Sequence, residues 1–192
     1  MAITEQVQPQ SLASLAEQPS EISASEAIVK TYFQKTAGDW RSQRRYYTLS
    51  SNDVQEVESF LGIQFLEQGA PELQQLAAMH ELSDLCQMTS GVSMTWESNY
   101  IGPSARKLTG STVFGVWKDN LYRDRGFATT KPIIATFKMP EAEVMSLRTE
   151  YNGSRFEEEI KLIGNDYRTR QTVISRAGKE QMIGQYLERR IA

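Results

Sequence analysis

Alternation between apolar and polar residues is the clearest pattern in the second half of the chain. From residue 92 onward, Val92, Met94 and Trp96 share one face of an extended segment, and polar residues occupy the other face. Residues 155–162 repeat this pattern, with a mainly apolar face that begins at Phe156 and a row of charged residues on the opposite face. A period of two residues is typical of β-strands that bury one face and expose the other to water.

Turn signals separate these segments at short intervals. Asn152-Gly153 is typical of a two-residue hairpin turn, and Gly164 and Gly178 lie in two further turns between apolar runs. Pro132 interrupts one of the segments. The pattern predicts strands over residues 40–49, 54–66, 92–100, 111–118, 126–139, 144–151, 156–162, 167–175 and 181–191.

Two segments have the spacing of helices instead. Residues 25–36 carry an apolar stripe at helical spacing. Ser23-Ala24-Ser25-Glu26, at the start of this segment, matches a capping box. Pro71 begins a second helix that we expect to reach about residue 87, because proline suits the first helical turn. Cys86 falls near the end of that helix, where a lone cysteine is usually a buried small hydrophobe, although a thiolate can also carry a ligand.

Eight to ten short strands joined by consecutive hairpins predict a mainly β fold, an up-and-down antiparallel barrel with one or two helices. Such a barrel has no exposed strand edges, and a barrel of this size can enclose one small ligand. The first helix is expected to close one end. Residues 1–22 are rich in Gln, Ser, Glu and Ala and are expected to be a mobile tail, so that residues 23–192 make up the barrel.

Composition excludes several classes of function. The 192 residues carry a formal net charge of −3, whereas nucleic-acid-binding proteins usually show a basic excess. One cysteine and one histidine, His80, are too few for an intramolecular disulfide or a Cys/His zinc site. A hydrolase triad would have to use His80, which makes this class of enzyme nearly excluded. No apolar run is long enough to span a membrane, and the start of the chain does not resemble a secretory signal, so a cytoplasmic location is expected.

Two arginines on one predicted strand are the most suggestive candidates for binding. Arg168 and Arg170 lie two residues apart, so their side chains share a face about 6.6 Å apart. Two parallel guanidinium groups suit a ligand with two separated carboxylates. The alternative is a solvated outer face, paired with Glu157 and Glu159 of the neighbouring strand.

Three further features each allow a functional and a structural interpretation. The segment 123–126, Arg-Asp-Arg-Gly, is an anion clamp or, more commonly, a salt-bridged loop. Glu150 is a proton-exchanging acid with a raised pKa if it faces the interior, and a plain surface acid if it faces outward. Trp40, Trp96 and Trp117 form either a stacking wall for a flat ligand or part of an ordinary core.

Several of these segments occur in an order that is similar to a known family. They are FQKTAGDWRSQR (33–44), VSMTWE (92–97), GSTV (110–113), LYRDRGF (121–127), TEY (149–151) and NDYRTRQTV (165–173). Their order and spacing resemble the CpcS/CpeS family of phycobiliprotein chromophore lyases, which includes the CpcU-type subunits. The resemblance implies a lipocalin-like barrel, similar to fatty-acid-binding proteins. It also implies binding of phycocyanobilin or a related bilin and its attachment to a cysteine of a phycobiliprotein subunit of the phycocyanin or allophycocyanin type.

For a bilin substrate, the candidate residues take definite roles. We expect Arg168 and Arg170 to bind the propionates, with help from Arg44 or Arg125, and Glu150 to hydrogen-bond the pyrrole nitrogens. The conjugated system is expected to stack on aromatic side chains. These are Trp96, Tyr46 and Trp117. No metal and no permanently bound cofactor is expected.

The resemblance also implies a homodimer or a heterodimer with a related lyase subunit. Where members commonly carry a histidine pair, this chain has Arg45, Tyr46 and Tyr47. This departure keeps one alternative open, a partner subunit of a heterodimeric lyase. A non-catalytic carrier of a bilin or fatty acid, built on the same barrel, is the other alternative.

Overall fold

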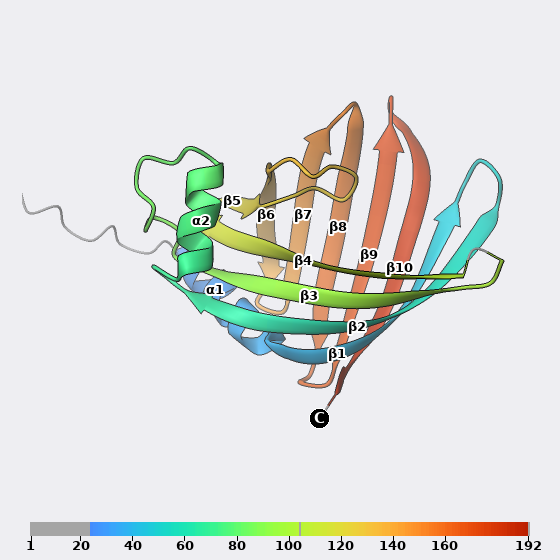
Figure 1. Cartoon of the computed structure of the whole chain (residues 1–192), viewed down its shortest axis with the longest axis horizontal. Coiled ribbons are helices and arrows are strands. Elements are labelled where there is room, and N and C mark those ends of the chain that lie inside the picture. Colours follow the sequence, from blue (N-terminus) through green and yellow to red (C-terminus); the bar gives the residue numbers. More distant parts are fainter. Residues whose placement is uncertain (1–23, 104, 192) are drawn as a thin grey trace, which may run out of the picture.

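A computed structural model describes residues 24–103 and 105–191, which form a closed barrel of ten antiparallel strands with two helices (Figure 1). Each strand pairs with the next one in the chain, and β10 closes the barrel against β1. The expected up-and-down barrel is therefore confirmed, while the tail expected over residues 1–22 lies outside the described residues. The elements are α1 (Ala24–Thr36), β1 (Gly38–Thr48), β2 (Asp53–Glu67), α2 (Pro71–Met79), β3 (Ser90–Ile101), β4 (Arg106–Trp117), β5 (Asn120–Arg123), β6 (Ile133–Glu141), β7 (Val144–Tyr151), β8 (Ser154–Ile163), β9 (Tyr167–Arg176) and β10 (Lys179–Ile191).

Helix α2 is shorter than its apolar pattern predicts. Glu81 has a positive φ of 55°, and two closing hydrogen bonds run from Glu81 N–H to Ala78 O and from Leu82 N–H to Ala77 O. This is a Schellman motif with glutamate in the place usually held by glycine, so the stop signal is absent from the sequence. The expectation that Cys86 is buried on this helix is wrong, because the residue lies exposed in the segment that leads to β3.

The strand expected over residues 126–139 also differs. The chain forms the short strand β5 first, then a loop over residues 124–132, and begins β6 only at Ile133. The loop is held by hydrogen bonds from Gly126 N–H to Thr129 O and from Ala128 N–H to the Tyr151 hydroxyl. These bonds replace a strand ladder, so the loop folds over the barrel instead of extending the sheet.

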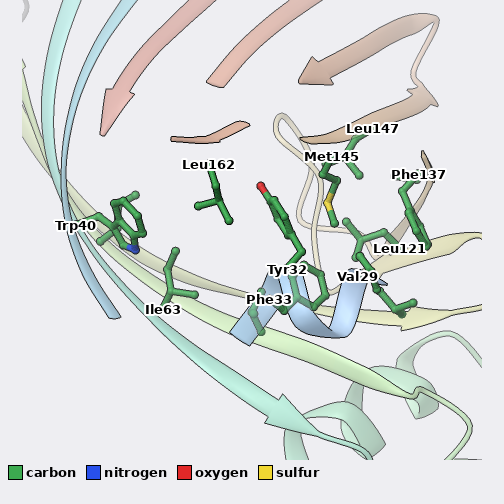
Figure 2. Close-up of a cluster of buried hydrophobic side chains, with 14 residues drawn as sticks. Val29, Tyr32, Phe33, Trp40, Ile63, Leu121, Phe137, Met145, Leu147 and Leu162 are labelled. Atoms are coloured by element: carbon green, nitrogen blue, oxygen red, sulfur yellow. The ribbon is translucent and has the colours of Figure 1, made fainter. Parts of the chain in front are cut away.

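Helix α1 lies across one end of the barrel and fills it with apolar side chains (Figure 2). Val29, Tyr32 and Phe33 project from the helix into a cluster of inward side chains from the strands. Trp40 is fully buried in this cluster, and its indole N–H donates to Thr36 O at 2.9 Å. The expectation that the first helix closes one end is confirmed, and Trp40 is a core residue.

Helix α2 packs on the outside of the barrel instead, against β3 and β4. Gly91 permits the close approach, because a Cβ atom there would lie 2.5 Å from Leu73 Cδ2 of the helix. Leu73, Leu76 and Ala77 form a second apolar cluster with the outer face of the sheet. With α1 filling one end and α2 outside, the remaining interior space lies toward the opposite end of the barrel.

Candidate functional site

The barrel interior holds a cavity of about 760 Å³ on the side away from α1. This volume lies within the range of about 300–1,000 Å³ that is typical of small-molecule sites. Strands β1 to β5, β9 and β10 line it, together with the loop between β5 and β6. Five residues expected at the site line the cavity: Arg44, Tyr46, Trp96, Arg125 and Arg170.

A buried tyrosine stands between two of these arginines. The guanidinium carbon of Arg44 lies 5.4 Å from the ring centroid of Tyr186, and that of Arg170 lies 5.0 Å from it. Tyr46 meets the same ring edge-on at 5.7 Å. Burial raises the pKa of Tyr186 well above its usual value, against the opposing effect of Arg170, so the hydroxyl stays neutral. The cluster therefore presents two guanidinium groups and two phenols to the cavity.

Arg168 lies deeper, on the side of α1, and does not line the cavity. Its Nε donates to Glu188, and Ser42 Oγ donates to the same carboxylate at 3.0 Å. Arg44 Nε in turn donates to Ser42 Oγ at 3.1 Å. Burial alone would raise the pKa of Glu188, but the charge and hydrogen bond of Arg168 hold it below the ordinary value. The chain of contacts makes Arg168 a group that orients Arg44.

Arg170 and Arg123 leave hydrogen-bonding capacity unused. Arg170 Nη2 donates to Glu158, but its Nε is buried without a partner among the described residues. The same holds for Arg123 Nε and, on the adjacent interior surface, for Thr172 Oγ1. Burial lowers the pKa of Arg123, and the attraction of Glu158 offsets this only in part. Buried polar atoms are normally paired, so these groups indicate a polar ligand.

Trp96 forms part of the cavity wall, as expected from its alternation with polar neighbours. Its indole lies over Gly110 of β4, where a Cβ atom would come 2.8 Å from Cε2 of the ring. Only glycine leaves this space, so the ring is held against the strand backbone. A flat aromatic surface of this kind suits a planar conjugated ligand.

The loop of residues 124–132 completes the wall. Asp124 Oδ1 accepts hydrogen bonds from Thr112 Oγ1 at 2.5 Å and from Val113 N–H at 3.2 Å. Arg125 lies 3.5 Å from the other oxygen of Asp124 and stays half-exposed at the cavity. The segment therefore combines both earlier interpretations: Asp124 and Arg125 form a salt-bridged loop, and Arg123 turns inward.

Two candidate residues lie outside the site. Glu150 is exposed on the outer face of β7, where it accepts hydrogen bonds from Arg148 and Arg155 at 2.7 and 2.8 Å. These arginines lower its pKa, so the expectation of an interior acid with a raised pKa is wrong. Trp117 faces outward from β4 and packs beside Tyr122 under α2, with ring centroids 6.3 Å apart, so it does not form a stacking wall for the cavity.

The outer-face alternative for the β9 arginines is also wrong. Both point inward and pair with Glu188 and Glu158 rather than with Glu157 and Glu159. Sequence reasoning missed these two buried carboxylates, together with Tyr186, and it named Arg123 only as part of the segment 123–126. The signal for Glu158 was present, because it interrupts the apolar face that begins with Phe156.

The described residues contain no group of three side chains suited to holding a metal ion. None of the helices in that part of the chain is both long and apolar enough to cross a membrane.

Comparison with known proteins gives a consistent picture. Residues 28–191 match the profile of the family described as CpeS-like protein. A Nostoc sp. protein named "Putative phycocyanobilin lyase CpcS 2" is 51% identical over 166 residues, covering 86% of this chain and 92% of that protein. A Picosynechococcus sp. protein named "Putative chromophore lyase CpcV" is 46% identical over 171 residues, covering 88% and 85%. The structure of the S-type phycobiliprotein lyase CpeS from Guillardia theta has the same fold, with a TM-score of 0.70 and 23% identity over 85% of this chain and 93% of that one.

Proposed function

The chain belongs to the CpeS-like protein family, and from that premise we propose that it is a chromophore lyase. It binds an open-chain bilin of the phycocyanobilin type in the barrel cavity. It then promotes formation of a thioether bond between the bilin and a cysteine of a phycobiliprotein subunit. The bilin is a substrate and leaves with the acceptor protein.

The excess of arginine over carboxylate inside the barrel carries this proposal. Among the described residues, two carboxylates face four guanidinium groups there: Glu158 and Glu188 against Arg44, Arg123, Arg168 and Arg170. This count leaves out the Asp124–Arg125 pair of the loop and Arg190, which donates to backbone carbonyls near α1. Uncompensated buried charge is costly, so the interior favours a ligand that brings negative charge. A bilin brings two propionates on a flat conjugated body, and the wall formed by Trp96 suits that body.

Two arginines of the expected set reach the cavity from neighbouring parts of the wall. Arg44 and Arg170 flank Tyr186, so they form one anion-binding position for a propionate. Arg168 supports this position through Glu188 and Ser42 instead of binding the ligand itself. Fixing the propionate fixes the bilin relative to the opening, which lowers the entropic barrier to attack by the acceptor thiolate.

Glu158 takes the part that the sequence suggested for Glu150. It is a buried carboxylate held beside cavity-lining Arg170, and it can accept hydrogen bonds from pyrrole N–H groups. Stabilising a protonated bilin makes the ethylidene group of ring A a better electrophile. The thiol then adds across that double bond: sulfur bonds to the ethylidene carbon, the thiol proton is transferred to the bilin, and no other group leaves.

A direct assay tests the proposed function. Purified protein is mixed with phycocyanobilin and a phycobiliprotein β-subunit, and zinc-induced fluorescence is measured on a denaturing gel. A fluorescent acceptor band that requires this protein supports the lyase. A shifted bilin absorbance without any band would instead support a carrier, or a subunit that acts only with a related partner.

The homodimer or heterodimer expected from the family stays a prediction. Light scattering of the purified chain, alone and mixed with a related lyase subunit, distinguishes the two assemblies. Attachment activity that appears only in the mixture would assign this chain to the heterodimeric class.

A further inference from the structure

Arg123 lies at the end of the short strand β5 and turns its side chain to the cavity. Its guanidinium group stacks on Phe114, with 4.5 Å between the guanidinium carbon and the ring centroid. Its Nε is buried and has no hydrogen-bond partner among the described residues. The strand is fixed from outside the barrel, because the ring of His80 hydrogen-bonds the carbonyl of Arg123 at 3.0 Å. Among the residues that the structure describes, the side chain is therefore held in place without a hydrogen-bond partner of its own.

The two interior carboxylates do not neutralise Arg123. In the described part of the chain, Glu188 pairs with Arg168 and Glu158 pairs with Arg170. Burial lowers the pKa of Arg123 despite the attraction of Glu158, and Arg170 adds a repulsive contribution. The charge of Arg123 is therefore available to a ligand.

The barrel places Arg123 far around the wall from Arg44. Strand β5 is separated from β1 by β2, β3 and β4 in one direction, and by five strands in the other. Strands in these positions face each other across the interior. Arg123 consequently approaches the cavity from the side opposite Arg44, while Arg170 of β9 is within electrostatic reach of Arg123.

We infer that Arg123 is a second carboxylate-binding residue of the cavity, which holds one propionate of the bilin while the position at Tyr186 holds the other. This inference rests on the proposed function and adds a binding residue to it. It also sets a requirement on the ligand: two carboxylates carried on neighbouring rings of a flat body, instead of the single carboxylate of a fatty acid.

Phycocyanobilin and its dimethyl ester test the assignment, because they share a chromophore and differ in charge. Binding is followed by the change in bilin absorbance for the parent protein and for Arg123→Gln. Loss of a hydrogen bond to a charged group reduces affinity by about 10- to 100-fold. We expect a loss of this size for the diacid and a change of less than about twofold for the ester. Arg189→Gln, on the exposed outer face of β10, is the matched control and should bind both probes like the parent.

Further variants separate a binding role from a structural one. The ligand-free Tm of Arg123→Gln should not fall, because the change removes a largely buried charge that forms no ion pair within the described part of the chain. Arg44→Gln combined with Arg123→Gln should show losses that multiply for the diacid, as expected for two separate positions. A lower Tm with equal losses for diacid and ester would identify Arg123 as structural and overturn the assignment.

The same titration distinguishes failure of the inference from failure of the proposed function. If the parent protein binds and attaches bilin while Arg123→Gln keeps parent affinity for the diacid, only the assignment of Arg123 is overturned. If the parent gives no absorbance change with the diacid, the proposed function itself fails.

Discussion

Replacing Glu188 by glutamine would show how strongly the interior charges depend on one another. Glu188 is 1% exposed and accepts hydrogen bonds from Arg168 and Ser42. Glutamine has a similar shape but leaves Arg168 buried without its counter-ion. Removing one partner of a buried ion pair costs about 3–5 kcal/mol of the free energy of unfolding. For a chain of this length the loss corresponds to a fall in Tm of roughly 6–20 °C.

The effect should depend on pH in a defined direction. Arg168 lowers the pKa of Glu188 in the folded state, so its charge stabilises the fold above the unfolded-state value of about 4.3. This contribution is lost as the pH falls through the lowered, folded-state pKa. The difference between parent and Glu188→Gln should therefore be fully present at neutral pH and shrink in acid.

Urea unfolding at neutral pH and in acid measures both effects. Glu159→Gln, on the exposed face of β8, is the control and should change the free energy of unfolding by less than about 0.5 kcal/mol. A loss for Glu188→Gln below about 1 kcal/mol, or one of equal size at both pH values, would show that the pair with Arg168 does not stabilise the fold as the reasoning requires.

Three further changes test the cavity wall. Gly110→Ala should displace Trp96 and cost about 1–3 kcal/mol of the free energy of unfolding by overpacking. The tryptophan emission should shift and bilin binding should weaken, whereas an unchanged emission would contradict the placement of Trp96 over Gly110. Tyr151→Phe removes the hydroxyl that anchors the β5–β6 loop, so hydrogen exchange in the loop should become faster while its loss of stability stays near 1 kcal/mol. Glu158→Gln should slow attachment at least about tenfold, whereas Glu150→Gln on the outer face should stay within about twofold of the parent.

The alternation of residues predicts which side chains share a face, but the interior face must be identified separately. In β7, Met145 and Leu147 are buried and set the interior face, which places Glu150 outside. That signal was readable in the sequence. In β4 it was not, because α2 covers the outer surface and makes both faces apolar, so the direction of Trp117 required the structure.

The ion pairs required the structure for a different reason. Glu158 lies opposite Thr172 in the β8–β9 register, and its partner Arg170 is the next inward residue along β9. Register depends on the turn at residues 164–166, and a shift by one residue would exchange the two faces. Glu188 is 20 residues from Arg168 along the chain, and only the pairing of β9 with β10 places them opposite one another.

Closure of one end of the barrel by α1 determines the order in which the bilin and the acceptor protein bind in the proposed reaction. A barrel filled at one end by Val29, Tyr32 and Phe33 loads and unloads through its other end. In the proposed reaction, the bilin must enter before the acceptor docks, and the acceptor must withdraw the attached pigment along the same route. The kinetics should therefore be ordered, with excess acceptor protein inhibiting by blocking pigment entry. The strength with which the arginines hold the propionates then also limits how fast product departs.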